Sequence, residues 1–411
     1  MSSVSVRVLV ASALSGGVFA LAGGAAGAEQ CSGATECLAQ GLELYRAKKY
    51  DQAAENFAQA CHSGSADACF NLGVLYADGR GAPQDQNVAN GYYEQACSMG
   101  KNSGCYNLGN ALMEGDQTSR IKARSFYARA CELEHGPGCN KLGAAFFESK
   151  DYKSATRYFE QSCQMDYATG CSNLAIIYHD GLEVEKDPAR SLSYYERSCS
   201  LGDAGGCMKS GDALYAGEEE SRDYARAYAF YAKACGLNHA TGCFNSGSLA
   251  DRGLGIERNK ALARQYYEKS CVMNSSSGCY NLANAYYNGD EIGQDFKKAG
   301  QYYEKACAMN HGNACNRLGG IYYQGRAGAL DSAVALNHFV KACSLDVGAG
   351  CMNAAMLYEK GHGAASDPKM AGGYFAKACD LKELSGCENA RRLAGDAISP
   401  EESGSGGDAR P

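Results

Sequence analysis

Cysteines are the residues of this chain with the most obvious chemical potential, and their spacing is regular. The 411-residue chain holds 22 of them. Thiols at this density can form disulfides or bind metal, and an even count this high favours an oxidising compartment. Twenty cysteines form ten pairs whose members lie eight residues apart: Cys61 with Cys69, Cys97 with Cys105, Cys131 with Cys139, Cys163 with Cys171, Cys199 with Cys207, Cys235 with Cys243, Cys271 with Cys279, Cys307 with Cys315, Cys343 with Cys351 and Cys379 with Cys387. Cys31 and Cys37 fall outside this spacing, and the sequence leaves open whether they bond each other.

Metal binding is the alternative use of these thiols, and the spacing does not favour it. Structural zinc needs four convergent donors, usually in two closely spaced pairs. The chain has no Cys-x2-Cys, His-x-His or His-Glu-x-x-His motif. His135, His239 and His311 each follow a first cysteine by four residues, where hydrogen bonds to carbonyls of the turn are the simplest expectation. We therefore expect no metal and no cofactor.

Serine nucleophiles are the second candidate chemistry. Three Ser-x-x-Lys matches occur, at Ser98–Lys101, Ser119–Lys122 and Ser366–Lys369. Serine enzymes that react with β-lactams continue this motif with Ser-Asp-Asn and Lys-Thr-Gly. Neither tripeptide is present, and serine and lysine are common enough here to give such matches by chance. The sequence therefore names no catalytic residue.

The elements that position the cysteines recur every 32 to 36 residues, a period typical of helical solenoids. After each second cysteine, small or apolar residues follow at i+3, i+4 and i+7, as in Cys69, Leu72, Gly73 and Tyr76, which indicates one face of a helix. A glycine ten residues after that cysteine is expected to end the helix in a left-handed cap. These glycines are Gly79, Gly115, Gly181, Gly217, Gly253, Gly289, Gly325 and Gly361.

A second helix closes each repeat at the next first cysteine. Asp187-Pro188 and Asp367-Pro368 are good helix starts, because Asp can cap and Pro is tolerated at the first position. An aromatic residue lies four positions before each closing cysteine and is expected in the core: Phe57, Tyr93, Tyr127, Phe159, Tyr195, Tyr231, Tyr267, Tyr303, Phe339 and Phe375. The fold class is therefore all-α, an αα-solenoid superhelix of about ten helix-turn-helix repeats spanning residues 29–395, with the half-repeat from Cys387 as its cap.

The two ends of the chain differ from the repeats. Residues 1–28, with one charge at Arg7, an apolar stretch and Ala26-Gly27-Ala28, predict a cleaved signal peptide. Residues 396–411 are polar and glycine-rich, and predict a disordered tail. No other segment is apolar enough to span a membrane. The net charge of -7 leaves no basic field for nucleic acid. We therefore expect a secreted or periplasmic protein.

The repeat unit resembles a known family. The segment Gly278-Cys279-Tyr280-Asn281-Leu282-Ala283-Asn284-Ala285-Tyr286-Tyr287-Asn288-Gly289, closed by Tyr302-Tyr303-Glu304-Lys305-Ala306-Cys307, is similar to a Sel1-like (TPR-like) repeat. The paired cysteines resemble those of the cysteine-rich Sel1-like proteins secreted by Helicobacter. That resemblance implies an αα-solenoid whose cysteines are disulfide-linked within each eight-residue spacing. It also implies weak penicillin binding or β-lactam hydrolysis, with a β-lactam or cell-wall fragment as ligand, and contact with host or envelope proteins.

A ladder of polar side chains offers a binding alternative to catalysis. The residue two positions after a second cysteine, here called a ladder position, is Asn71, Asn107, Asn173, Asn245, Asn281, Asn353 or Asn389, and is replaced by Lys141, Lys209 or Arg317 elsewhere. It lies about 200° around the helix from the cysteine, away from the packed face, and amides there suit a peptide backbone. The alternative is that each amide bonds a neighbouring carbonyl and fixes repeat stacking.

Aromatic residues beside the ladder also allow two interpretations. They lie one or eight positions after the second cysteine, and either anchor a ligand or cover the next repeat: Phe70, Tyr106, Phe244, Tyr280, Phe147, Tyr215, Tyr287 and Tyr323. The leading hypothesis is a repeat scaffold that binds a peptide or protein on its concave face. The alternative is a weak penicillin-binding protein or β-lactamase.

Overall fold

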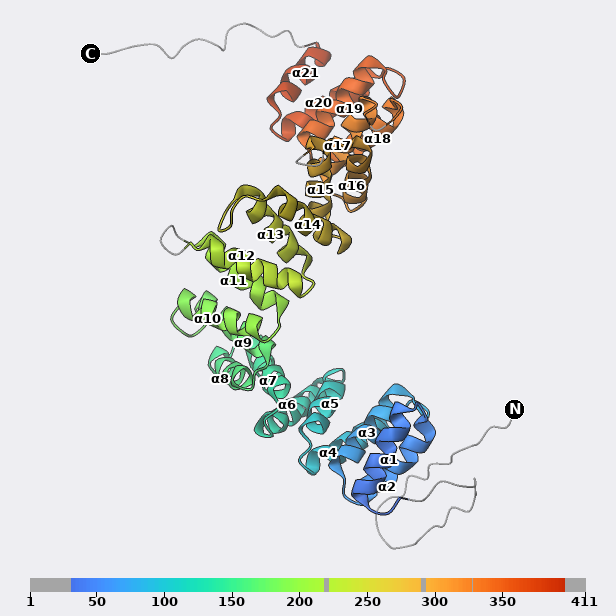
Figure 1. The fold of residues 1–411 in the computed structure, drawn as a ribbon, viewed down its shortest axis with the longest axis vertical. Helices are drawn as coiled ribbons and strands as arrows, with labels where there is room; N and C mark the ends of the chain where they lie inside the picture. The colour runs from blue at the N-terminus through green and yellow to red at the C-terminus, as the bar shows by residue number, and fades with distance from the viewer. Residues whose placement is uncertain (1–30, 218–221, 290–292, 327, 396–411) are drawn as a thin grey trace, which may run out of the picture. The chain divides into compact units, whose positions relative to one another are not determined.

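Helices make up all regular structure in the described part of the chain (Figure 1). A computed structural model describes residues 31–217, 222–289, 293–326 and 328–395. The predicted signal peptide and tail lie outside these residues. The helices are α1 (Ala34–Arg46), α2 (Tyr50–His62), α3 (Ala66–Asp78), α4 (Gln86–Ser98), α5 (Asn102–Met113), α6 (Gln117–Glu132), α7 (Gly136–Glu148), α8 (Tyr152–Gln164), α9 (Ala168–Asp180), α10 (Pro188–Ser200), α11 (Ala204–Ala216), α12 (Tyr224–Gly236), α13 (Ala240–Arg252), α14 (Lys260–Val272), α15 (Ser276–Asn288), α16 (Phe296–Ala308), α17 (Gly312–Tyr323), α18 (Ser332–Ser344), α19 (Gly348–Lys360), α20 (Pro368–Asp380) and α21 (Leu384–Ala394).

The helices pack in sequence order within two compact units, which divide between Ala111 and Leu112. In the first unit, α1 packs on α2 and α3 on α4, and α2 also contacts α3. In the second unit the same pattern runs from the α7/α8 pair to the α19/α20 pair, and α21 packs on α20. Within each unit, apart from α5, whose residues fall on both sides of the division, the helices therefore contact their neighbours along the chain, which confirms the predicted αα-solenoid.

Disulfides close the corners between consecutive repeats. Cys61 lies in the last turn of α2 and Cys69 in the first turn of α3, with their Cα atoms 4.7 Å apart. Nine more pairs of the same spacing are bonded in the same way: Cys97 with Cys105, Cys131 with Cys139, Cys163 with Cys171, Cys199 with Cys207, Cys235 with Cys243, Cys271 with Cys279, Cys307 with Cys315, Cys343 with Cys351 and Cys379 with Cys387. Every eight-residue pair expected from the family resemblance is therefore a disulfide in this structure.

The two cysteines outside the regular spacing are also bonded. Cys31 and Cys37 form a disulfide with a Cα–Cα distance of 5.0 Å, so the question left open by the sequence is answered. This bridge lies at the start of α1, before the first full repeat corner. All 22 cysteines lie in the described residues, and none is free.

The turn inside each disulfide loop has the same backbone conformation in every repeat. The residue three positions after the first cysteine is left-handed, with φ between 55° and 92°. This conformation costs little for Gly and is adopted more readily by Asn and Asp than by other residues. Glu134 and Lys382 are exceptions to that preference. The ten residues are Gly64, Gly100, Glu134, Asp166, Gly202, Asn238, Asn274, Asn310, Asp346 and Lys382.

Helix ends follow the predicted capping in most repeats. Asp187 Oδ1 accepts a hydrogen bond from the Arg190 amide at 2.9 Å, and Pro188 is the first helical residue. Left-handed glycine caps end α3, α9, α13, α15 and α19. The prediction is wrong for Gly115 and Gly217. The α5–α6 connection is so short that Asp116 already caps α6, and Gly217 is extended, with φ -53° and ψ 157°.

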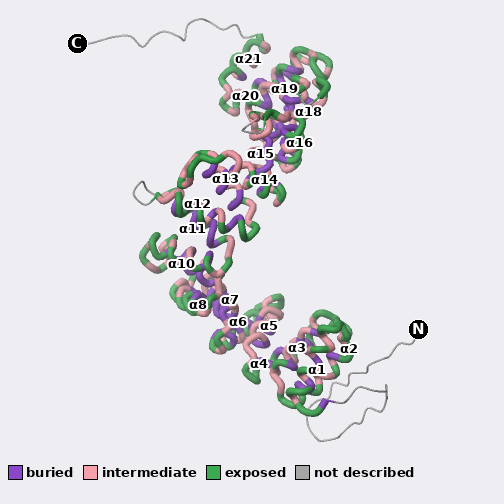
Figure 2. The backbone as a smooth tube through the Cα atoms, viewed as in Figure 1, coloured by how far each residue is buried: buried purple, intermediate pink, exposed green. Residues whose placement is uncertain are grey.

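The core is built locally, repeat by repeat. All ten predicted core rings are buried, none more than 7% exposed. In five repeats a glycine four positions after the second cysteine lies against the core ring of the same repeat: Gly73, Gly143, Gly211, Gly247 and Gly319. At Gly73, for example, an added Cβ would lie 2.8 Å from Tyr93 Cδ1. Figure 2 shows buried stretches recurring along the described helices. Because one face of each first helix packs against the core ring, the side chains on its other faces remain available for other contacts.

Candidate functional site

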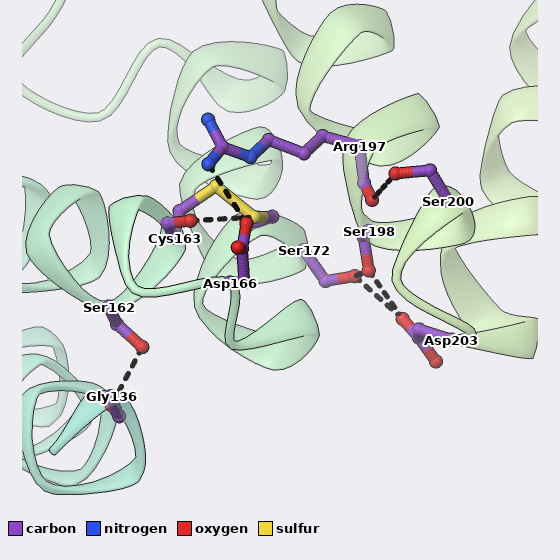
Figure 3. The surroundings of a disulfide bond; sticks show 10 residues. Gly136, Ser162, Cys163, Asp166, Ser172, Arg197, Ser198, Ser200 and Asp203 are labelled. Atoms are coloured by element: carbon purple, nitrogen blue, oxygen red, sulfur yellow. Dashed lines mark hydrogen bonds and ion pairs between the residues drawn. A yellow bond between two sulfur atoms is a disulfide. The ribbon is translucent and has the colours of Figure 1, made fainter.

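Polar contacts at the Cys163–Cys171 corner are structural (Figure 3). Ser162 Oγ donates to the Gly136 carbonyl at 2.8 Å, and Arg197 pairs with Asp166 at 3.2 Å. Ser172 and Ser198 lie 2.7 Å apart, and the Oγ of each donates to Asp203 Oδ2 at 2.8 Å.

The carboxylate of Asp203 also caps α11. Burial raises its pKa, but hydrogen bonds from Ser172, Ser198 and two backbone amides outweigh burial, so the pKa lies below its ordinary value. The ionised carboxylate accepts all of these bonds. Ser198 is fully buried, so it is not an accessible nucleophile.

The Ser-x-x-Lys matches make other contacts. Ser98 Oγ donates to the Gln95 carbonyl at 2.7 Å, while Lys101 pairs with Asp67. Ser366 Oγ donates to the Glu359 carbonyl at 2.9 Å. These side chains serve helix ends and connections, and they give no support to a serine mechanism.

The three turn histidines are helix caps. The Nδ1 atoms of His135, His239 and His311 accept hydrogen bonds from the backbone amides of Gly138, Gly242 and Ala314 at 3.2 to 3.3 Å. The partners are therefore N–H groups of the following helix, not the carbonyls expected from the sequence. Burial lowers the pKa of His135 and of His311, which favours the neutral ring that such a cap requires.

Asparagines at ladder positions contact the repeat before them. Where the preceding core ring is a tyrosine, the amide hydrogen-bonds its hydroxyl: Asn107 with Tyr93, Asn245 with Tyr231 and Asn281 with Tyr267. Burial is the main cause of a raised pKa in each of these tyrosines. The ring is thus both a core residue and an anchor for the next helix.

Where the core ring is a phenylalanine, the amide finds another partner. Asn173 Nδ2 donates to Asn140 Oδ1 at 2.8 Å, and Asn353 Nδ2 donates to Asn316 Oδ1 at 2.8 Å. Asn389 Nδ2 bonds the Ser385 carbonyl within its own helix. The ladder asparagines, including Asn71, are half-buried, whereas Lys141, Lys209 and Arg317 are exposed. These contacts support a stacking role for the amides, and their contact with a ligand stays a prediction.

The aromatic residues beside the ladder also cover neighbouring elements. Phe70 packs on the core ring Tyr93, with centroids 5.9 Å apart. Tyr287 meets Phe296 edge-on at 5.2 Å. The Tyr215 hydroxyl accepts a hydrogen bond from Arg252 at 2.8 Å. Partial burial of these rings against the next helix or repeat supports the covering role.

One pocket nevertheless gathers ladder side chains at the surface. It has a volume of about 300 Å³ and lies over α14 and α15, with walls from α13 and α17; we call it the α15 pocket. One face of α15 supplies Asn281, Asn284 and Asn288. Asn284 Oδ1 accepts a hydrogen bond from Tyr303 at 2.6 Å, and its Nδ2 donates to Asn281 Oδ1 at 3.4 Å. Asn281 and Asn284 are therefore held in place before any ligand arrives.

Charged side chains complete the α15 pocket. Lys260 and Arg264 come from α14, Arg317 from the ladder position of α17, and Asp251 from α13. Among the described lining residues, three are cationic and one is anionic, in a chain whose net charge is -7. The repeat pattern of the sequence indicates Asn281 and Arg317 but not Arg264, since only the packing of α14 against α15 brings Arg264 to them.

A second pocket occupies the equivalent place two repeats earlier. This α11 pocket, of about 670 Å³, lies over α10 and α11. Lys209 stands where Asn281 stands in the α15 pocket, Asp212 where Asn284 stands, and Leu192 where Arg264 stands. The two pockets thus lie at equivalent positions in the repeat, but different side chains give them different chemistry.

Two further features bear on binding. Among the described residues, no cluster of three or more His, Cys, Asp or Glu side chains is arranged to hold a metal ion. No helix in the described ranges has the length and apolar character needed to cross a bilayer.

These helical pairs define an αα-repeat protein, and comparison of its sequence with known families identifies the type of repeat. The Sel1 repeat model matches nine segments that together cover well over half of the chain, so the chain belongs to the Sel1 repeat family. The matched segments are 66–101, 102–135, 137–167, 168–203, 204–239, 240–274, 276–311, 312–347 and 348–383. A search among curated proteins gives no match.

Two solved structures share the fold, and a third is similar over part of the sequence. A protective antigen present in uropathogenic Escherichia coli strains, which displays an SLR fold, is 25% identical over 89% of this chain and 80% of its own, with a TM-score of 0.65. A Sel1 repeat protein from Oxalobacter formigenes is 18% identical over 73% of this chain and 89% of its own, with a TM-score of 0.59. Helicobacter pylori cysteine rich protein B is 36% identical over 33% of this chain and 96% of its own, with a TM-score of 0.28.

Proposed function

We propose that this chain is a disulfide-braced scaffold that binds a peptide or protein along the face carrying its ladder positions, in a secreted or periplasmic setting. The Sel1 repeat fold supports a role in protein interaction. The eleven disulfides are consistent with an oxidising compartment, and the predicted signal peptide agrees with that setting.

The α15 pocket is the observation that carries the proposal. It opens beside a ladder position, and two of its amides, Asn281 and Asn284, are already held by Tyr303 and by each other. Side chains fixed before binding lose less conformational entropy when a ligand arrives. Asparagine side chains offer both donors and acceptors, which match those of an extended polypeptide backbone.

A selection from a phage-displayed peptide library by the oxidised full chain tests the proposal. We expect enriched peptides whose binding falls at least about tenfold in the triple variant Lys141→Ala, Lys209→Ala, Arg317→Ala. These three exposed cations occupy ladder positions, and we call the surface that carries the ladder positions the ladder face. The matched control removes three exposed cations from second helices: Lys153→Ala, Lys233→Ala and Lys297→Ala. Failure to enrich any peptide, or equal loss in both variants, contradicts the proposal.

β-Lactam hydrolysis is implied by the family resemblance alone, and no contact described above favours it. Turnover of a chromogenic β-lactam by the purified oxidised chain separates the two functions. We expect no turnover above buffer. Robust turnover that is lost in Ser98→Ala, Ser119→Ala or Ser366→Ala would replace the scaffold by an enzyme.

A further inference from the structure

The α15 pocket combines two guanidinium groups with a row of fixed amides. Arg264 reaches it from α14 and Arg317 from α17. Neither arginine forms a salt bridge with a carboxylate of the described residues, although Asp251 lies in the same wall. A guanidinium presents its donors in a planar fork that matches a carboxylate, so two of them at one pocket favour an anionic ligand.

The amides beside these arginines favour a polypeptide over a small inorganic anion. Asn281, Asn284 and Asn288 lie three to four residues apart on α15, so they follow one another along the same face of the helix. Hydrogen bonds orient the first two: Asn281 with Tyr267, and Asn284 with Tyr303. A row of amides longer than one anion suits a backbone that runs along α15 beside the charged group.

Rings at the rim of the pocket are also held in place. Tyr280 stacks on His311 with ring centroids 4.4 Å apart, and the Arg326 guanidinium lies 5.4 Å from the Tyr287 ring. The two tyrosines can therefore border a ligand without losing much freedom of their own. Aromatic residues are enriched in protein-binding surfaces.

From these contacts we infer that the α15 pocket receives a carboxylate of an extended polypeptide, bound between Arg264 and Arg317 while the chain on either side contacts the α15 amides. The inference rests on the proposed peptide-binding function and adds the chemistry that its ligand must carry. It applies to this pocket alone. The α11 pocket has Leu192 and Asp212 at the places of Arg264 and Asn284. Its lining holds two lysines, Lys186 and Lys209, but no arginine, and the carboxylates of Asp180 and Asp212 oppose an anionic ligand.

Three fluorescein-labelled hexapeptides test this inference by fluorescence anisotropy with the oxidised full chain. The first alternates alanine and glutamate and is amidated at its C-terminus. The second has glutamine in place of glutamate, and the third is the glutamine peptide with a free terminal carboxylate. We expect the glutamate peptide to bind at least about tenfold tighter than the amidated glutamine peptide. If the third peptide binds as tightly as the first, the pocket accepts a terminal carboxylate as well as a side-chain carboxylate.

Variants locate the site. Arg264→Ala with Arg317→Ala should weaken binding of the glutamate peptide about tenfold or more, whereas Lys233→Ala with Lys297→Ala removes the same charge elsewhere and should have little effect. Both cations of the first variant are at least partly exposed, so the fold is expected to survive, and circular dichroism checks this. In the reverse direction, Leu192→Arg with Asp212→Asn should strengthen binding of the same peptide by giving the α11 pocket similar chemistry.

The outcomes separate this inference from the proposed function. Equal binding of the glutamate and amidated glutamine peptides, or equal loss in the two double variants, overturns the carboxylate site. If library peptides bind through the ladder face but carry no acidic residue or free terminus, the scaffold function stands and the carboxylate site falls. If no library peptide binds, the proposed peptide-binding function is contradicted, and the carboxylate site, which rests on it, is contradicted with it.

Discussion

The α15 and α11 pockets occupy the same place in two repeats, yet their linings differ. Both lie over a second helix and the first helix that follows it. The α15 pocket carries arginines and amides, whereas the α11 pocket has Leu192 where Arg264 would stand. The comparison shows that the repeat sets where a pocket forms, while a few side chains outside the core set what it can bind.

Breaking the disulfide that joins the two main helices of each pocket gives the largest expected effect on stability. Replacing both Cys271 and Cys279 by Ala should lower the stability of the α14–α15 corner by about 2.5 kcal/mol, the chain-entropy value for a loop of this length. The same change at Cys199 and Cys207 should loosen the α10–α11 corner similarly. Because repeats contact only their neighbours, hydrogen exchange should rise mainly in the helices of the corner that was cut. Uniform loss of protection along the chain would contradict this local effect.

The next largest effect on stability is expected where Gly247 contacts Tyr267, a ring that lines the α15 pocket. Gly247→Ala would place a Cβ 2.8 Å from Tyr267 Cε1, so the ring must shift, at a cost of about 2 kcal/mol. Gly236 on α12 is the matched control, since a Cβ there meets no atom within 4 Å. Gly236→Ala should instead raise stability, by up to about 1 kcal/mol. Chemical denaturation checks both, and a gain in the Gly247 variant would show that Tyr267 moves freely.

Acid should lower the stability of the α10–α11 corner, where Asp203 caps α11, but not that of the α14–α15 corner. Asp203→Ala removes a helix cap and the carboxylate that accepts from both serine hydroxyls, so at neutral pH we expect a loss of about 1.5 kcal/mol. The folded pKa of Asp203 is lowered, so this stability is present above the ordinary pKa and is lost as the pH falls through the folded value.

The measurement is urea denaturation of the wild type and the variant from pH 6 down to pH 2. The difference between them should shrink below about pH 4. The α15 corner is the control, because its cap, Ser275, does not titrate. Ser275→Ala should cost about 1 kcal/mol, with little change over that range. A constant Asp203 difference down to pH 2 would contradict the ionised cap.

The smallest effect concerns the ring beneath each ladder position. Tyr267→Phe removes the hydroxyl that bonds Asn281 and should lower the free energy of unfolding by about 1 kcal/mol. Tyr195→Phe is the control, because Lys209 stands at the ladder position there, and its cost should be under about 0.5 kcal/mol. Equal costs would mean that Asn281 contributes nothing to stacking. The phenylalanine variant should keep its core packing, which a near-ultraviolet spectrum checks.

Much of this fold follows from the sequence, since local spacing determines it. The eight-residue cysteine spacing spans one turn between helices, and the small residue near each core ring marks where two helices meet. Gly217 shows a limit, because a glycine permits a left-handed cap without requiring one. The left-handed residue inside each disulfide loop also had a signal in the sequence, the frequent Gly, Asn and Asp at that position.

The candidate site was only partly predictable. The ladder amides were found, and their partners also had a signal in the sequence: Asn107, Asn245 and Asn281 each follow a tyrosine core ring, whereas Asn173 and Asn353 follow a phenylalanine. The α15 pocket could not be found in this way. It joins side chains from four helices, and no short spacing shows that α14 and α17 turn their arginines toward the same place.

The short reach of every disulfide bears on how the chain acquires its structure. Each bridge joins cysteines six or eight residues apart, so the two partners are synthesised almost together and can pair before any distant segment is made. Closing a loop of that size costs little entropy compared with joining remote positions. A growing chain can therefore oxidise correctly from its first repeat onward, with incorrect pairing disfavoured by distance alone. A longer array of the same repeats could be oxidised just as readily as a short one.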